Sequence, residues 1–220
     1  MKNILIMGGK GPAVVIANAI DHANKIGYSE YQCAGLINDN EKEIDGYKVF
    51  GKFSDISKLV DDGYYIINTI YKMGAQEDRV KMFNSLGIPD DKLAVFIHPF
   101  AYVSPSATLS PGCVVMPNAT VSAQTRLGKC CLLMTNSSVG HDNDIGAFNF
   151  FTSNSCLGSY IKTGYSVWFG MNCTVRGKLN IGNRASVGIG AVVTKDIPDD
   201  EIWIGNPAKL HKTNDDKITL

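Results

Sequence analysis

The 220-residue sequence lacks the features that mark several large classes of protein. Neither charge is in excess, because 21 Lys and Arg residues balance 21 Asp and Glu residues, so no net field attracts nucleic acid or an anionic membrane. No apolar run approaches the roughly 20 residues of a membrane-spanning helix. The apolar start at residues 4–7 is too short for the core of a signal peptide. We therefore expect a cytoplasmic protein that binds neither nucleic acid nor a membrane.

Cysteine is present without a recognisable pairing pattern. The six cysteines include no CxxC pair, and Cys130 and Cys131 are adjacent. This usage is more typical of reduced, buried thiols than of a disulfide framework or a zinc site.

A repeat of six residues runs through the second half of the sequence. Every sixth residue from Val103 to Val193 gives sixteen positions, of which fifteen are apolar. The following residue is glycine in eight of these hexads, and the fifth is mostly small or aliphatic. A period of six fits neither an amphipathic helix nor an alternating strand. It predicts a three-sided solenoid, in which each hexad supplies a short strand and a corner and glycine permits the positive φ that corners often need.

The first third follows a different pattern. We expect strands over residues 3–7, 32–37 and 64–70, and helices over residues 13–25, 54–60 and 76–86. The turn Gly8-Gly9-Lys10-Gly11 joins the first strand to the first helix, so the order predicts a small Rossmann-like βαβ unit with an anion-facing helix start. These glycines also suit a plain tight turn. The predicted domains are an α/β Rossmann-like domain over residues 1–97 and an all-β solenoid domain with a C-terminal tail over residues 98–220.

Two segments carry a family resemblance. IGNRASVGIGAVVTKDIP and WIGNPAKL resemble the hexapeptide-repeat acyltransferases with a left-handed parallel β-helix. With the Rossmann-like start and the linker FIHPFAYVSPSATL, the whole chain resembles the sugar acetyltransferases of the NeuD and PglD type, and perosamine N-acetyltransferase has a similar layout. The resemblance implies a front domain that binds the nucleotide of an activated sugar and a β-helix that binds acetyl-CoA. It also implies a homotrimer.

His141 and Asp142 follow Gly140 at a predicted corner, where side chains project outward. Acyl transfer requires the attacking amine or hydroxyl to lose a proton, and histidine, which titrates near neutral pH, suits that task. The resemblance implies that His141 is the general base and that Asp142 raises its basicity. A solvated surface imidazole is the simpler alternative. His141 is the only histidine within the hexads, so the three-histidine zinc site of γ-type carbonic anhydrases is excluded and we expect no metal.

The resemblance also implies which residues bind the two substrates. For acetyl-CoA they are Phe150, Met171, Gly188, Ile189, Gly190, Asn206, Pro207, Ala208 and Lys209. For the sugar nucleotide they are Gly9, Lys10, Gly11, Pro12, Asn38, Asp39, Asn68, Thr69, Met134 and Asn136. Four positions depart from the family pattern, namely Pro12, Asn68, Met134 and Phe150. The His141–Asp142 pair is kept, so we expect the same reaction on a different acceptor.

The expected activity is acetyl-CoA-dependent acetylation of an amino group on a nucleotide-linked 4-amino sugar, in the synthesis of surface glycans. O-acetylation of a sugar hydroxyl, as in sialic acid O-acetyltransferases, is an alternative. A non-catalytic hexapeptide scaffold is a further alternative from another class.

Overall fold

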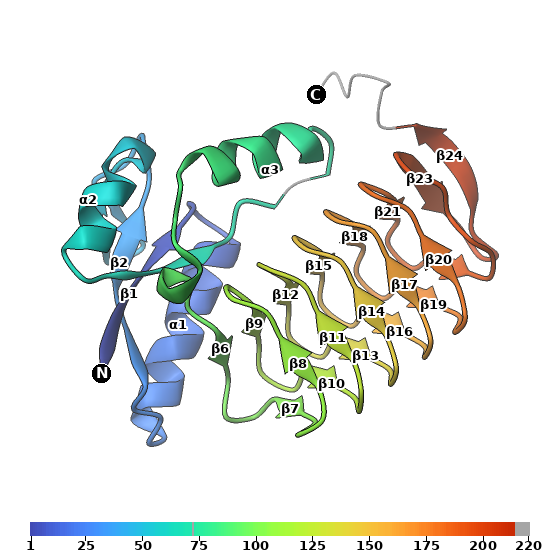
Figure 1. Ribbon diagram of the computed structural model, residues 1–220, viewed down its shortest axis with the longest axis horizontal. Coiled ribbons are helices and arrows are strands. Elements are labelled where there is room, and N and C mark those ends of the chain that lie inside the picture. The colour runs from blue at the N-terminus through green and yellow to red at the C-terminus, as the bar shows by residue number, and fades with distance from the viewer. Residues whose placement is uncertain (72, 214–220) are drawn as a thin grey trace.

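The computed structural model describes residues 1–71 and 73–213, which form two differently built parts (Figure 1). A front α/β part is followed by a stack of coils made of short parallel strands. The predicted fold class, a Rossmann-like unit followed by a left-handed β-helix, is confirmed. The boundary at residues 97 and 98 stays a prediction, and the last seven residues of the second predicted domain lie outside the described part. No helix among the described residues is long and apolar enough to cross a membrane.

The front part is a five-stranded sheet in the order β3-β4-β2-β1-β5. Its strands are β1 (Lys2–Met7), β2 (Tyr31–Ile37), β3 (Glu43–Ile44), β4 (Tyr47–Gly51) and β5 (Tyr65–Asn68). Its helices are α1 (Pro12–Lys25), α2 (Ile56–Asp61) and α3 (Gln76–Ser85), with short 3-10 turns at Phe53–Asp55 and Asp90–Lys92. Strands β3 and β4 were not predicted, because they are short and half-exposed at the sheet edge and show little periodicity.

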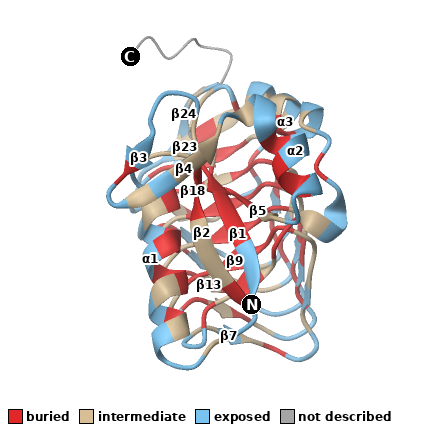
Figure 2. Cartoon of the chain, turned by 90° about the vertical axis from the view of Figure 1, so that its left-hand side faces the viewer, coloured by how far each residue is buried: buried red, intermediate tan, exposed pale blue. Residues whose placement is uncertain are grey.

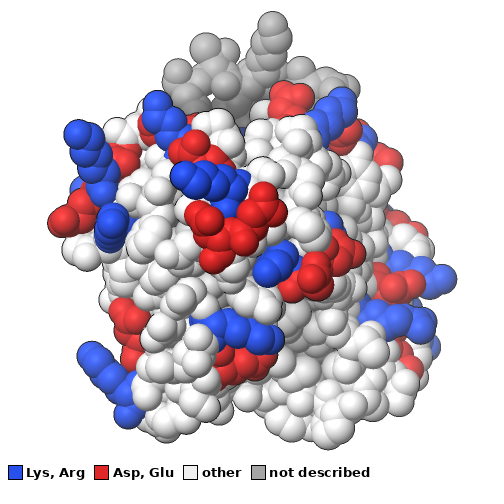
Figure 3. Space-filling view, turned by 60° about the vertical axis from the view of Figure 1, so that its left-hand side comes forward, with Lys and Arg blue, Asp and Glu red and all other residues white. Residues whose placement is uncertain are grey.

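Buried strand β1 lies between α1 on one side and α2 and α3 on the other (Figure 2). Helix α1 buries Ala13, Ile16 and Ile20 against this sheet and the β-helix together. The surface carries both charges interspersed, without a large area of one sign on the face that Figure 3 shows. This agrees with the balanced composition.

The coils form three parallel sheets, which we name by their outward residues. The covered sheet contains β6 (Phe96–Ile97), β9 (Val114–Val115), β12 (Leu132–Leu133), β15 (Phe150–Phe151), β18 (Trp168–Phe169), β21 (Ser186–Val187) and β23 (Glu201–Ile204), and is closed by antiparallel β24 (Lys209–Thr213). The neutral sheet contains β7 (Tyr102–Val103), β10 (Thr120–Val121), β13 (Ser138–Val139), β16 (Cys156–Leu157), β19 (Thr174–Val175) and β22 (Val192–Val193). The charged sheet contains β8 (Thr108–Leu109), β11 (Arg126–Leu127), β14 (Asp144–Ile145), β17 (Lys162–Thr163) and β20 (Asn180–Ile181).

The three sheets differ in what they present to the outside. The covered sheet presents Phe96, Val114, Leu132 and Phe150, all buried in one core cluster with the front part. The neutral sheet presents only uncharged residues, whereas the charged sheet presents Arg126, Asp144 and Lys162 between two polar residues. The front part therefore occupies one of the three faces and leaves the other two open.

The glycines of the hexads have a different role from the predicted one. The positive φ falls two residues later, for example at Asp142 (φ 55) and Tyr160 (φ 60), and the eight hexad glycines lack it. These glycines are required by close approach instead, since a Cβ on Gly140 would lie 2.6 Å from the carbonyl oxygen of Gly158 in the next coil. The predicted reason was wrong, because a period of six reveals a repeat but not the contact between coils.

Candidate active site

His141 and Asp142 lie at the corner between β13 and β14, on the edge that joins the neutral and charged sheets. Nδ1 of His141 lies 2.7 Å from Oδ2 of Asp142. Both side chains are partly exposed, at 51% for His141 and 40% for Asp142, so a substrate can reach the imidazole. When Nδ1–H donates to the carboxylate, Nε2 is left with a free lone pair that can accept a proton.

Asn143 holds this corner from the inside of the β-helix. It is 1% exposed, and its Nδ2 donates to the carbonyl oxygens of Gly140 (2.8 Å) and Gly158 (2.9 Å). Its Oδ1 accepts the backbone N–H of Ile161 at 2.6 Å. Since these bonds join the coil of His141 to the next coil, Asn143 fixes the backbone that carries the pair.

The next coil supplies two neighbours of His141. The backbone N–H of His141 donates to Oγ of Ser159 at 3.2 Å. The ring of Tyr160 lies edge-on to the imidazole, with the two ring centroids 5.2 Å apart. A hollow beside the pair is lined by Gln124, Arg126, Asp142, Asn143, Asp144, Tyr160 and Lys162. Ser159 and Tyr160 were not predicted, although they stand eighteen residues, or three hexads, after His141 and Asp142.

Most residues predicted for acetyl-CoA lie on a different edge, between the covered and neutral sheets. Met171 and Ile189 are exposed there at 47% and 70%, and Gly190 (φ 66) donates its N–H to the Met171 carbonyl at 2.8 Å. The segment from Asn206 to Lys209 follows β23 on the same side, where the N–H of Ala208 donates to the carbonyl of Val192. Within one chain, this set and His141 are separated by the width of the neutral sheet.

The residues predicted in the front part come together at the carboxyl ends of β1, β2 and β5. Several of their polar groups are used within the protein: Nδ2 of Asn38 donates to the Gly8 carbonyl (3.1 Å), Oγ1 of Thr69 donates to the Met7 carbonyl (2.6 Å), and Oδ1 of Asp39 accepts the N–H of Phe53 (2.8 Å). Gly11 (φ 98) stands directly before Pro12 at the helix start, and Gly9 and the exposed Lys10 precede it. The order of strand, glycine turn, helix and strand is the one that the sequence predicted for the βαβ unit.

A small cavity lies between the end of β5, α3 and the covered sheet. It brings together Asn68 from the predicted sugar set and Phe150 from the predicted acetyl-CoA set. Phe150 is 5% exposed and contacts the rings of Tyr71 and Trp168. Met134 packs against the same cluster, whereas Asn136 (φ 62) is exposed on the edge between the covered and neutral sheets.

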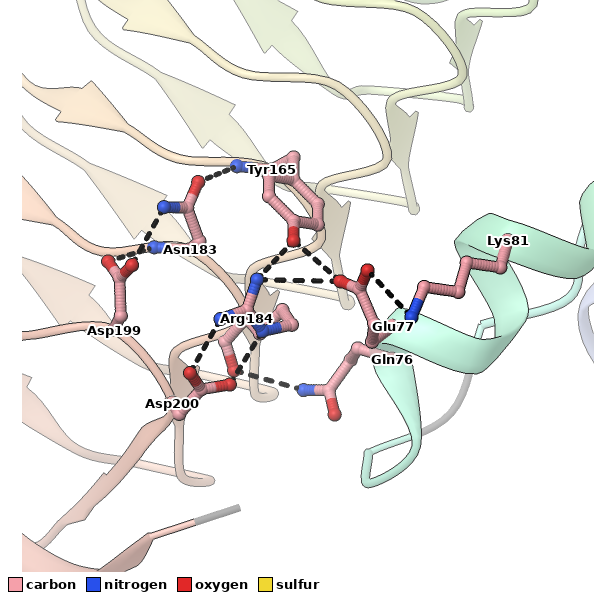
Figure 4. A network of polar contacts seen from close by, with 8 residues as sticks. All are labelled: Gln76, Glu77, Lys81, Tyr165, Asn183, Arg184, Asp199 and Asp200. Atoms are coloured by element: carbon pink, nitrogen blue, oxygen red, sulfur yellow. Dashed lines mark hydrogen bonds and ion pairs between the residues drawn. The ribbon is translucent and has the colours of Figure 1, made fainter. Parts of the chain in front are cut away.

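Helix α3 is anchored to the later coils, between residues 165 and 200, by a polar network (Figure 4). Nε and Nη2 of Arg184 each donate to Asp200 at 2.6 Å, and Nη1 lies 3.4 Å from Oε2 of Glu77. The hydroxyl of Tyr165 donates to Glu77 at 2.5 Å, and this bond, with help from Lys81 and Arg184, lowers the pKa of the Glu77 carboxyl. The buried Gln76 donates to Ser186 at 3.1 Å. This network seats α3 over the cavity.

Among the described residues, no three His, Cys, Asp or Glu side chains are grouped so that they could hold a metal ion.

The chain is similar to acetyltransferases of known structure along nearly its whole length. It matches a point mutant of perosamine N-acetyltransferase from Caulobacter crescentus, solved with CoA and GDP-perosamine, with 27% identity and a TM-score of 0.83, over 96% of this chain and 98% of that one. The acetyltransferase domain of PglB from Neisseria gonorrhoeae, solved with acetyl coenzyme A, matches with 28% identity and a TM-score of 0.82, over 96% and 99%. The predicted resemblance to the NeuD and PglD type is confirmed.

Matches to curated proteins are shorter. A putative acetyltransferase of Staphylococcus aureus strain MRSA252 is 38% identical over 58 residues, which are 26% of this chain and 29% of that protein. UDP-N-acetylbacillosamine N-acetyltransferase of Bacillus subtilis strain 168 is 28% identical over 121 residues, 53% of this chain and 52% of that protein. The chain thus aligns with about half or less of these relatives, and no family model matches it.

Proposed function

We propose that this chain is an acetyl-CoA-dependent acetyltransferase that acetylates an amino group of a nucleotide-linked 4-amino sugar, in the synthesis of surface glycans. The observation that carries the proposal is the exposed His141–Asp142 pair, whose 2.7 Å contact leaves Nε2 free to accept a proton. Support comes from the similar structures, which contain CoA or acetyl-CoA, and one of which also contains GDP-perosamine. The cytoplasmic location expected from the sequence stays a prediction.

In the proposed reaction, the amine nitrogen of the acceptor attacks the thioester carbonyl carbon, and Nε2 of His141 takes the proton that this nitrogen loses. A C–N bond forms, and the negative charge on the carbonyl oxygen is stabilised by N–H donors. Collapse of this intermediate breaks the C–S bond, and the imidazolium returns the proton to the leaving sulfur. The products are the N-acetylated sugar and CoA with a free thiol. Asp142 stabilises the imidazolium through its negative charge.

The homotrimer expected from the resemblance is part of this proposal. His141 and the predicted acetyl-CoA residues occupy the two edges that border the neutral sheet, and the front part covers a different sheet. If the neutral sheets of three chains face one another around a three-fold axis, the edge with Ile189 in one chain approaches the edge with His141 in its neighbour. In that arrangement the site would be shared between neighbouring subunits.

The test is a panel of nucleotide-linked and free amino sugars with acetyl-CoA, in which release of the CoA thiol is measured. Thiol release that depends on a 4-amino nucleotide sugar is expected. Release only with an acceptor that offers a hydroxyl and no amine would favour O-acetylation instead. No release with any acceptor, from a protein that is folded and trimeric, would favour the non-catalytic scaffold.

A further inference from the structure

Three corners of the β-helix carry larger side chains than their backbone conformation favours. From Gly112 to Gly190, the fourth residue of each hexad adopts positive φ, which Asn, Asp and Gly tolerate better than bulky residues do. Three of these positions nevertheless carry a ring or a guanidinium, namely Phe148, Tyr160 and Arg184. A large, stiff side chain in this conformation is unfavourable unless a contact or a functional role offsets the backbone strain.

Phe148 and Arg184 have a structural reason to be there. Both stand on the edge between the charged and covered sheets, beneath α3. Phe148 is 8% exposed and packs against Phe83 of α3 at 5.3 Å, and Arg184 joins Asp200 and Glu77. Each of them holds the front part on the coils.

Tyr160 has no such contact. It stands on the same edge of the β-helix as His141, away from the front part, and is 53% exposed. Its only aromatic neighbour among the described residues is His141, and within that part of the chain its hydroxyl forms no hydrogen bond. Burial in the core therefore does not account for a tyrosine at this corner.

The surroundings of Tyr160 indicate what its ring meets. On the side of the charged sheet, the hollow offers donors from Gln124, Arg126 and Lys162 and acceptors from Asp142 and Asp144. On the other side lie the small uncharged residues of the neutral sheet, such as Ser138 and Cys156. Hydroxyl groups of a sugar match the first surface, and the apolar C–H face of a pyranose matches an aromatic ring. The thin pantetheine arm of CoA carries no charge and, unlike a sugar, no cluster of hydroxyl groups to match this hollow.

We propose that Tyr160 is a specificity-determining contact for the acceptor. Its ring packs against the sugar ring beside His141, while the hollow with Arg126 and Lys162 receives the sugar hydroxyls. This inference rests on the proposed function and adds the place of the acceptor to it. Tyr160 takes no proton in the reaction.

The experiment compares Tyr160→Asn, Tyr160→Phe and Lys178→Asn in the full-length chain, using the best acceptor from the panel. Lys178 is the matched control, because it has the same corner conformation on the same edge, one coil further from His141. Asparagine already occupies this conformation at positions 118, 136, 154 and 172, so both Asn variants should keep or raise the melting temperature. A fall in melting temperature specific to Tyr160→Asn would show a packing role.

Tyr160→Asn should raise the KM for the acceptor about tenfold and leave the KM for acetyl-CoA unchanged, because only ground-state and transition-state binding of the sugar is lost. Tyr160→Phe keeps the ring and should stay within about twofold of wild type. Lys178→Asn should match wild type. An unchanged acceptor KM in Tyr160→Asn, or an equal rise in the KM for acetyl-CoA, would overturn the inference while active wild-type protein keeps the proposed function. A wild type that releases no thiol with any acceptor would overturn the proposed function itself.

Discussion

Asp142 holds Nδ1 of the neighbouring His141 at 2.7 Å, although residues adjacent in a strand point to opposite faces. The contact is possible because Asp142 has left the strand conformation and adopts a φ of 55° at the corner. Aspartate accepts this conformation more readily than most residues. The turn of the coil thus brings a carboxylate and an imidazole into register on one exposed edge.

Replacement of His141 by asparagine should lower turnover by about 10²–10⁴-fold, the usual contribution of a general base. The affinity for CoA should change little, because proton acceptance is needed only during the reaction. Rates from thiol release and CoA affinity from calorimetry measure the two effects separately. Equal turnover in wild type and His141→Asn would leave this corner as an ordinary turn of the coil.

Asn143→Ala should lower the free energy of unfolding by about 2–4 kcal/mol, because the carbonyl groups of Gly140 and Gly158 and the N–H of Ile161 lose a buried partner. Ser155→Ala is the matched control: its Oγ is buried and has no hydrogen-bond partner among the described residues, so removal should be neutral or slightly stabilising. Urea denaturation measures both changes. A similar loss in the two variants would contradict the positioning role of Asn143.

The stability of the protein should fall as the pH decreases from about 7 to 5, partly through His98. This residue is fully buried. Its Nδ1 accepts the N–H of Phe100 (3.1 Å), so its Nε2–H donates to Nδ1 of His22 on α1 (3.1 Å). Burial, together with the nearby His22, lowers the pKa of His98. The unfolded chain therefore binds a proton first, and stability present above about pH 6.5 is lost below it.

His98→Asn keeps an acceptor for the Phe100 N–H but cannot titrate. It should be less stable than wild type at pH 7, since the contact with α1 is altered, yet show a shallower loss between pH 7 and 5. Urea denaturation at several pH values gives both slopes. Parallel curves for the two proteins would rule out titration of His98 as a source of the acid sensitivity.

Thr174→Glu should reduce the predicted trimer to monomers, because Thr174 is exposed on the neutral sheet, where three like charges would be buried together. Thr108→Glu is the same substitution at an exposed position on the charged sheet, and it should leave the mass unchanged. Light scattering at micromolar concentration gives the masses. Trimers with Thr174→Glu, or a monomeric wild type, would contradict the role of the neutral sheet.

Much of the architecture could be read from the sequence because it depends on local periodicity. Val139 and Ile145 are inward because an apolar residue every sixth position can only line the inside of a coil, and His141, two residues after Val139, has to stand at a corner. The glycine loop before Pro12 likewise follows from local turn chemistry. These features involve residues only a few positions apart.

The tertiary structure alone decided which residues meet across coils and across the two parts. Tyr160 contacts His141, and Asn143 reaches Gly158, because each coil closes after eighteen residues and stacks directly on the last. The front part covers one sheet because Phe96, Leu132 and Phe150 present an apolar surface to α1 and β1. This leaves the edge of His141 and the edge of Ile189 on the two sides of the uncovered neutral sheet. Periodicity sets which residues face inward, but the stacking of coils and the burial of apolar surface set their neighbours.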